Sequence, residues 1–185
     1  HTSQVFLYLI DKLGVNEIIN DMPFLSTSCE LPKEIMHFKK RIIVNINSSN
    51  MINLRNWPLE KFSYLVDLIL SRFEESVVFF IGTGSESKYV KKTIDLIKHK
   101  EKLERIFDLS GKTTLKELLG LFNKSDILIT VDSGPAHIAS LTRIKIITLF
   151  GPETPVLYAP ISLYAKNVYL DLACQPCVSV FNGKK

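Results

Sequence analysis

Hydrophobic runs alternate with helical stripes along most of the chain, and this alternation predicts the fold class. Five runs rich in apolar residues are typical of strands: IIVNI (42–46), VVFFI (77–81), RIFDL (105–109), ILITV (127–131) and KIITLF (145–150). Most of them lack a polar residue at every second position, which a strand with one solvent-exposed face would show. We therefore expect strands that are buried on both faces, as in parallel sheets.

Helical stripes lie between these runs. We expect helices over residues 58–73, from Ser85 to about Lys98, from Thr114 to about Lys124, and after Gly134. Pro58 suits the first turn of its helix, and Thr114 with Glu117 has the spacing of a capping box. Strands that alternate with helices in this way predict an α/β fold with a doubly wound parallel sheet.

The first forty residues are less regular. Residues 5–13 predict a helix that Gly14 ends, whereas residues 20–34 mix two prolines with small polar residues and predict a linker. The first residue is His1 rather than Met, so we expect a fragment or a processed chain. The expected organisation is a short N-terminal segment (1–19), a linker (20–40) and one domain (41–185).

Composition and charge narrow the class of protein. A chain of 185 residues is long enough for one domain with its own core. No run of about 18 apolar residues and no signal peptide occurs, so we expect no membrane span. The net charge of +4 comes with scattered lysines, which favours a small anionic ligand and not a nucleic acid. Three cysteines, an odd number, indicate a reducing compartment.

The loops that follow the predicted strands are all small and polar. In doubly wound sheets, ligands bind beyond the carboxyl ends of the strands. The loops at that edge are Asn47–Asn50, Gly82–Glu86, Gly111–Thr113, Asp132–Gly134 and Gly151–Thr154. Five such loops on one edge predict a binding site there.

The stretch VDSGPAHIASL (131–141) joins a buried strand to a helix and carries an acid and a histidine. Asp132 alone is explained as the N-cap of the helix, and His137 alone as a structural histidine. Together with Gly134, however, they suit an anion, because glycine lets backbone N–H groups approach it closely at a helix N-terminus. His137 could donate to a phosphate or sugar oxygen, and Asp132 could accept from a hydroxyl. The combination favours a phosphorylated, sugar-like ligand.

Three other features have two interpretations each. GTGSE (82–86) is either half of a dinucleotide fingerprint or a tight turn with Ser85 as N-cap. Glu86 either interacts favourably with the helix dipole in the first helical turn or accepts a hydrogen bond from a ribose hydroxyl. Arg55 is either a surface arginine stacked on Trp57 or a bidentate phosphate clamp. The cysteines of CQPC (174–177) have redox or zinc spacing, but a zinc site would lack its other ligands.

The stretch VDSGPAHIASLTRIKIITLFGPETP (131–155) closely resembles the signature of glycosyltransferase family nine, the ADP-heptose:lipopolysaccharide heptosyltransferases and their relatives. RNWPLEKFSYLVDLI (55–69), LSGKTTLKELLGLFNKSDILITVD (109–132) and CQPC resemble further family segments. The resemblance covers residues 41–181. It implies the Rossmann-like C-terminal, donor-binding half of a two-domain GT-B enzyme, with residues 1–19 as the end of the acceptor half.

The resemblance also implies roles for particular residues. It places Asp132, Ser133, Gly134 and His137 at the donor sugar and diphosphate. It further places Ser48, Ser49 and Arg55 at the phosphates, and Glu86 and Thr113 near the nucleoside. The chain has no D-x-D motif, in agreement with a family that uses no metal. We expect no cofactor besides the donor substrate, ADP-heptose.

The implied reaction is inverting, metal-independent transfer of heptose from ADP-heptose to the lipopolysaccharide inner core. It would take place in the cytoplasm, at the inner face of the inner membrane, where a lipid-linked saccharide acceptor lies. The general base would belong to the N-terminal half, so we expect this chain to be inactive alone. Three alternatives stay open: a transferase for another nucleotide sugar, a non-catalytic nucleotide-binding module, and a GT-B-fold epimerase, which would need acid/base carboxylates in the cleft.

Overall fold

Six parallel strands form one sheet in the computed structural model, which describes residues 1–14, 24–31, 35–48, 53–170 and 172–177. The strands are β1 (Lys40–Asn45), β2 (Ser76–Ile81), β3 (Ile106–Asp108), β4 (Ile127–Val131), β5 (Lys145–Leu149) and β6 (Ala165–Val168). Their order in the sheet is β3-β2-β1-β4-β5-β6, the order of a Rossmann fold. The predicted α/β class and parallel sheet are confirmed.

The sixth strand is missing from the sequence prediction, which ended the sheet with the run 145–150. β6 pairs in parallel with β5 and lies at the edge of the sheet. It has four residues, alternately half-buried and exposed, and its sequence AKNV includes a lysine and an asparagine. The prediction of five strands was wrong because a short, half-solvated edge strand lacks the apolar run on which the prediction depended.

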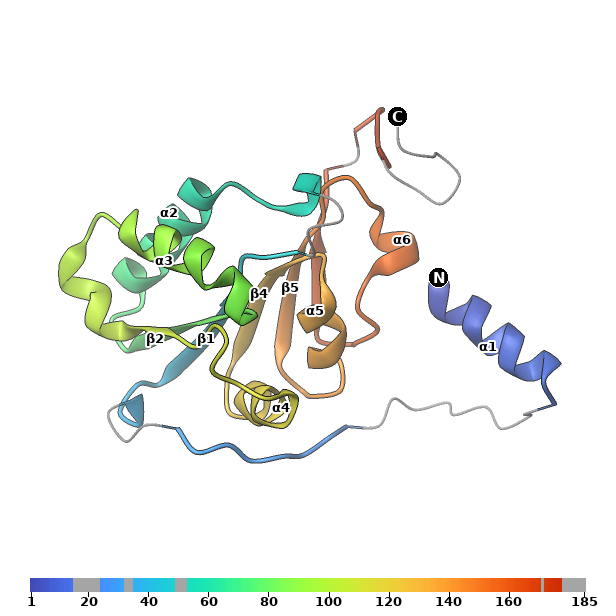
Figure 1. The fold of residues 1–185 in the computed structure, drawn as a ribbon, viewed down its shortest axis with the longest axis horizontal. Helices are drawn as coiled ribbons and strands as arrows, with labels where there is room; N and C mark the ends of the chain where they lie inside the picture. The colour runs from blue at the N-terminus through green and yellow to red at the C-terminus, as the bar shows by residue number, and fades with distance from the viewer. Residues whose placement is uncertain (15–23, 32–34, 49–52, 171, 178–185) are drawn as a thin grey trace.

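Helices cover both faces of the sheet (Figure 1). The helices are α2 (Leu59–Arg72), α3 (Ser87–Asp95), α4 (Leu115–Asn123), α5 (Gly134–Ala139) and the short α6 (Pro155–Tyr158), with 3-10 turns η2 (Asn53–Arg55), η3 (Gly84–Glu86) and η4 (Lys100–Arg105). α2 and α4 confirm two predicted helices, and Thr114 with Glu117 forms the capping box of α4. The helix predicted from Ser85 is instead η3 followed by α3, and its cap is Thr83, paired with Glu86.

The core has two layers, one on each face of the sheet. Ile43 and Phe79 belong to the cluster beneath α4 and α5, whereas their neighbours Val44 and Phe80 belong to the cluster beneath α2 and α3. All four side chains are at most 1% exposed. Because successive strand residues point to opposite faces, a strand buried on both faces has to be apolar throughout.

The described part of the segment predicted as a linker packs on the domain. Ile35 is fully buried, and Cys29 and Leu31 pack against the same cluster as α4. A side chain at Gly120 of α4 would bring its Cβ within 2.7 Å of the Cys29 nitrogen. Gly120 therefore permits the close approach of this segment to α4. Whether the segment joins two domains, with residues 1–19 belonging to the other one, stays a prediction.

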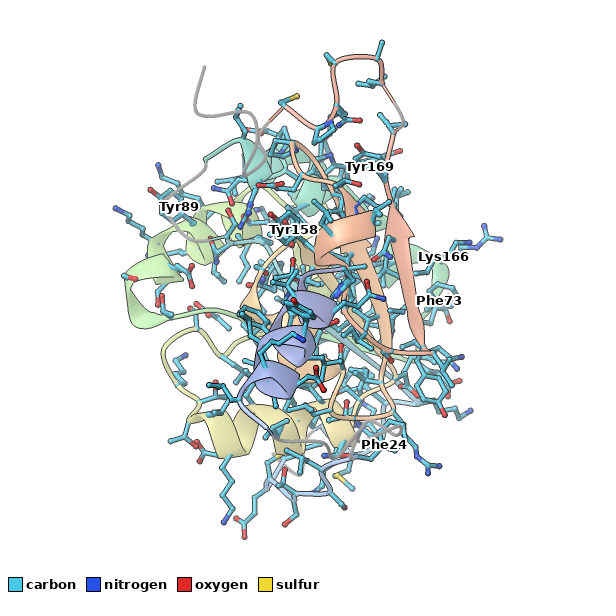
Figure 2. All side chains as sticks on the ribbon, turned by 90° about the vertical axis from the view of Figure 1, so that its right-hand side faces the viewer. Phe24, Phe73, Tyr89, Tyr158, Lys166 and Tyr169 are labelled. Atoms are coloured by element: carbon cyan, nitrogen blue, oxygen red, sulfur yellow. The ribbon has the colours of Figure 1, made fainter. Side chains whose placement is uncertain are left out.

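Helix α1 (Thr2–Lys12) stands apart from the sheet in Figure 1. None of its side chains is buried. Its first turn contacts the α6 region, where the Thr2 hydroxyl donates to the carbonyl of Leu157 at 3.0 Å. Figure 2 looks onto this side of the molecule, with Lys166 of β6 pointing outward from the sheet edge. No helix in the described ranges is long and apolar enough to cross a membrane.

Candidate functional site

The site lies where β1 and β4 are neighbours in the sheet. The connections from these two strands lead to opposite faces, which opens a crevice between the loops beyond their carboxyl ends. Asn45, the last residue of β1, is 2% exposed and bridges the two loops. Its Nδ2 donates to the hydroxyl of Ser133 at 2.8 Å, to that of Thr130 at 3.0 Å and to the carbonyl of Asn47 at 2.9 Å. These bonds fix the shape of the crevice.

A cavity of about 540 Å³ occupies this crevice, a volume within the range of small-molecule sites. Residues after four strands line it: Asn47 and Ser48; Gly82, Thr83, Gly84 and Glu86; Gly111, Thr113 and Thr114; Ser133, Gly134 and Pro135. A neighbouring hollow of about 360 Å³ shares Asn47, Ser48 and Glu86 and extends to Trp57 and Tyr89. The predicted edge of the sheet therefore does carry a cavity, whose largely apolar lining includes several polar side chains.

The glycines at this edge have two different functions. Gly111 has a φ of +70°, and a Cβ there would lie 2.7 Å from the Cα of Gly84. Its N–H donates to the carbonyl of Gly82 at 2.8 Å. The G-x-G pattern thus allows two loops to pack backbone against backbone. A Cβ at Gly134, in contrast, would meet nothing within 4 Å, so this glycine leaves the cavity wall open to a ligand.

The start of α5 settles one of the open alternatives. Its N-cap is Ser133, whose side chain makes no capping hydrogen bond, so Asp132 is not the cap. The Ser133 hydroxyl donates to the carbonyl of Val131 at 3.0 Å and accepts from Asn45. Ser133 and Gly134 both line the cavity, and the hydroxyl of Ser133 already has partners within the protein.

Asp132 belongs to a cluster of two acids and one arginine. Its Oδ2 lies 3.5 Å from Nε of Arg55, whose Nη2 lies 3.3 Å from Oε1 of Glu153. The Asp132 and Glu153 side chains are only 7% and 5% exposed, and that of Arg55 is 23% exposed. Arg55 is thus not a free surface arginine. The Trp57 ring meets Phe62 edge-on, with 5.0 Å between ring centroids.

Burial raises the pKa of both carboxyl groups in this cluster. For Asp132, the loss of hydration outweighs the opposing effects of the Arg55 and His137 charges, which lower the pKa. For Glu153, burial again has the largest effect, Arg55 lowers the pKa, and the neighbouring Asp132 charge raises it further. One guanidinium therefore does not fully compensate two buried acids, and an additional cationic or hydrogen-bonding partner would be favourable here.

Ser48, Glu86 and Thr113 are the remaining predicted residues that line the cavity, whereas His137 is not part of its lining. Ser48 is buried, and its hydroxyl donates to Asn56 Oδ1 at 2.7 Å. Glu86 Oε2 accepts from the Thr83 N–H at 2.6 Å, and Thr113 lines the cavity wall. His137 is exposed on α5. Ser49 lies outside the described residues. The structure thus gathers Ser48, Glu86, Thr113, Ser133 and Gly134 around one cavity and places Arg55 with Asp132 in the acid cluster.

Three residues of the site have no role in the sequence prediction: Asn45, Asn47 and Glu153. Nδ2 of Asn47 is buried without a hydrogen-bond partner among the described residues. Asn45 interrupts the apolar run IIVNI (42–46) in the sequence, a pattern that could have indicated a bridging residue. Glu153 lies in one of the predicted polar loops, but its contact with Arg55 joins positions 98 residues apart and gives no local signal in the sequence.

The cysteine pair lies beside the loop that carries Glu153. Cys174 and Cys177 are free thiols, and the backbone N–H of Cys177 donates to the carbonyl of Pro152 at 2.9 Å. The neighbouring Gln175 side chain donates to the carbonyl of Gly151 at 2.6 Å. Within the described ranges, no three His, Cys, Asp or Glu side chains gather as metal ligands. The cysteine segment thus holds the loop by two hydrogen bonds. That the enzyme needs no metal stays a prediction.

Sequence comparison identifies the family. Residues 17–183 match the family described as glycosyltransferase family 9 (heptosyltransferase). The chain belongs to glycosyltransferase family 9. Among curated members, lipooligosaccharide heptosyltransferase 2 of Campylobacter jejuni serotype O:6 is 30% identical over 183 residues, covering 96% of this chain and 56% of the relative. Lipopolysaccharide heptosyltransferase 3 of Escherichia coli K12 is 32% identical over 165 residues, covering 86% of this chain and 46% of the relative.

Solved structures of family 9 share the fold. The family 9 glycosyltransferase from Veillonella parvula aligns with a TM-score of 0.72 at 22% identity, covering 91% of this chain and 49% of that one. ADP-heptose lps heptosyltransferase II from E. coli aligns with a TM-score of 0.67 at 18% identity, covering 81% and 47%. The chain thus spans about half the length of the relatives it matches.

Proposed function

We propose that the chain is the donor-binding half of a family 9 heptosyltransferase and that its crevice binds the ADP portion of ADP-heptose. The observation that carries this proposal is the cavity between the β1 and β4 loops, which is lined by Asn47 and has Gly134 open beside it. Among the described residues, the buried Nδ2 of Asn47 has no hydrogen-bond partner. An unpaired buried donor is costly without a partner, and a polar ligand would supply one. Membership of the heptosyltransferase family supports the choice of donor.

The arrangement gives each end of the donor its own contacts. Backbone N–H groups at Ser133 and Gly134, together with Arg55, would bind the diphosphate. Asp132 would accept from a heptose hydroxyl, and His137 would donate to a sugar or phosphate oxygen. On the other side of the cavity, Thr113 and Glu86 would contact the nucleoside.

The proposed reaction is displacement at the anomeric carbon. An acceptor hydroxyl of the lipopolysaccharide inner core attacks that carbon, the bond to the diphosphate oxygen breaks, and ADP leaves. The configuration at the anomeric carbon is inverted. Arg55 and the backbone N–H groups would stabilise the charge that develops on the leaving diphosphate, without a metal. The general base would come from the part of the enzyme that holds the acceptor. The enzyme would act in the cytoplasm at the inner membrane, on a lipid-linked saccharide.

Calorimetric titration of the chain with ADP, UDP and GDP tests the proposal. We expect ADP to bind, and to bind more tightly than the other two nucleotides. Thr27→Ala changes an exposed hydroxyl that donates to Lys116 O, away from the cavity lining, and serves as a control that should leave ADP affinity unchanged. Tighter binding of UDP or GDP would point to a different nucleotide sugar, and no binding of any nucleotide would overturn the proposal.

A further inference from the structure

Glu153 is the least explained acid in the site. Its side chain is 5% exposed, and an acid is rarely buried this far unless it is paired. Oε1 contacts Nη2 of Arg55, whereas Oε2 is buried with no hydrogen-bond partner in the described part of the chain. Its contact with Arg55 is therefore its main stabilising interaction, and removing Arg55 would leave a buried carboxylate without its partner.

The two acids hold the same edge of the Arg55 guanidinium. Nε faces Asp132 and Nη2 faces Glu153, and these two nitrogens form one side of the planar fork. Nη1 makes no hydrogen bond with any described residue, and Nε is buried, so the exposed part of the side chain lies away from Nε. The free edge can therefore offer N–H groups to an anion while the other edge stays fixed.

The loop of Glu153 is built against the element that carries Arg55. A Cβ at Gly151 would lie 3.1 Å from the carbonyl oxygen of Leu54 in η2, so the two backbones are in close contact. Gln175 and Cys177 bond the carbonyls of Gly151 and Pro152 from the outer side. Glu153 thus has a fixed position relative to Arg55, as a side chain that orients another one requires.

We propose that Glu153 is a positioning residue: together with Asp132 it holds the Nε–Nη2 edge of Arg55, so that the Nη1 side is directed at the donor diphosphate. The inference rests on the proposed function of the crevice. Without Glu153, Asp132 would be the sole counter-ion of Arg55. The same carboxylate would then have to serve both the guanidinium and a sugar hydroxyl.

A double-mutant cycle read by ADP titration tests this role. Glu153→Ala should weaken ADP binding by about tenfold in the native background and by no more than about twofold in an Arg55→Ala background, because coupled residues lose their effect together. Adenosine, which lacks phosphates, should bind both backgrounds equally. Glu153→Gln keeps the length and an acceptor oxygen, so it should restore most of the affinity. Glu117→Gln, the same change in the α4 capping box, is the matched control and should have no effect.

Each other outcome contradicts the inference in its own way. Equal losses in both backgrounds would make Glu153 a structural residue only, and tighter ADP binding by Glu153→Ala would show that it competes with the ligand for Arg55. If the alanine variant does not fold, Glu153→Gln carries the cycle, with an expected loss of about threefold confined to the Arg55 background. An unsubstituted chain that fails to bind ADP would overturn the proposed function itself and this inference with it.

Discussion

Asp132 follows β4 directly, and its buried carboxylate lies 3.5 Å from Nε of Arg55. Its place after a buried strand and before Gly134 predicted a site, and in the structure the two residues that follow it, Ser133 and Gly134, line the cavity. Its ordinary explanation as an N-cap was wrong, since Ser133 holds that position. Its ion pair with Arg55 could not be predicted from spacing, because Arg55 lies in another loop, far away in the sequence.

Asp132→Asn should weaken binding of ADP-heptose by about 1–3 kcal/mol, the range for a hydrogen bond to a charged group. The loss should be smaller with ADP, which lacks the heptose hydroxyls that Asp132 is proposed to contact. Titrating both ligands into the native chain and the variant measures the difference. Unchanged affinity for ADP-heptose would remove Asp132 from the sugar site.

The same substitution should change how stability depends on pH. Burial raises the folded-state pKa of Asp132 above its unfolded value of about 3.8, so the folded chain binds more protons between those two pKa values. The free energy of unfolding contributed by this group is therefore highest at low pH and falls as pH rises through that window. Urea unfolding of the native chain and Asp132→Asn at several acidic and neutral pH values compares the two. We expect the variant to gain stability relative to the native chain as pH rises, and a constant difference would contradict the shift.

At the scale of elements, the apolar runs predicted the central strands and the edge strand β3, and they missed β6 at the other edge of the sheet. ILITV is β4 residue for residue, whereas AKNV of β6 gave no signal because half of an edge strand faces solvent. The capping box of Thr114 and Glu117 could be predicted from the sequence because its two residues lie three positions apart. Contacts between residues this close in the sequence can be predicted from their spacing. The contacts between the loops of the site join distant parts of the chain, so spacing does not predict them.

Thr114→Ala should lower the free energy of unfolding by about 1 kcal/mol, the usual cost of losing an N-cap side chain. Its hydroxyl accepts from the N–H of Glu117 at 3.3 Å, and this bond is lost in the variant. Thr113→Ala, which removes the hydroxyl next to it, is the control for stability. Urea unfolding of the three chains gives the values, and equal stability of both variants would mean that the cap contributes nothing.

Removal of residues 1–14 should change the free energy of unfolding by less than about 0.5 kcal/mol, as for surface changes that bury nothing. Helix α1 has no buried side chain, and hydrogen bonds from His1 and Thr2 to the carbonyls of Ala159 and Leu157 join its start to the α6 region. Urea unfolding of the shortened chain beside the native one tests this. A clear loss of stability would show that α1 packs on the domain more closely than the structure describes.

At the scale of the whole molecule, the alternation of strands and helices predicted a parallel sheet with a site beyond the carboxyl ends of its strands. The order of the strands, which places the crevice between β1 and β4, comes from the structure. The chain spans about half the length of its relatives, and the sheet has two complete cores of its own. We therefore predict that the chain folds alone and binds ADP but transfers no heptose. Proximity of the acceptor and general-base catalysis contribute many orders of magnitude in rate, and both are assigned to the acceptor half. A transfer assay with ADP-heptose and a core acceptor measures this, and turnover by the chain alone would place the base within it.

The central claim is that the crevice between the β1 and β4 loops binds the donor nucleotide. A crystal structure of this chain with ADP tests it most directly. We predict the diphosphate against the backbone of Ser133 and Gly134, within reach of Arg55, and the adenosine toward Thr113 and Glu86. ADP bound only at the opposite edge of the sheet, beyond the amino ends of the strands, would contradict the account.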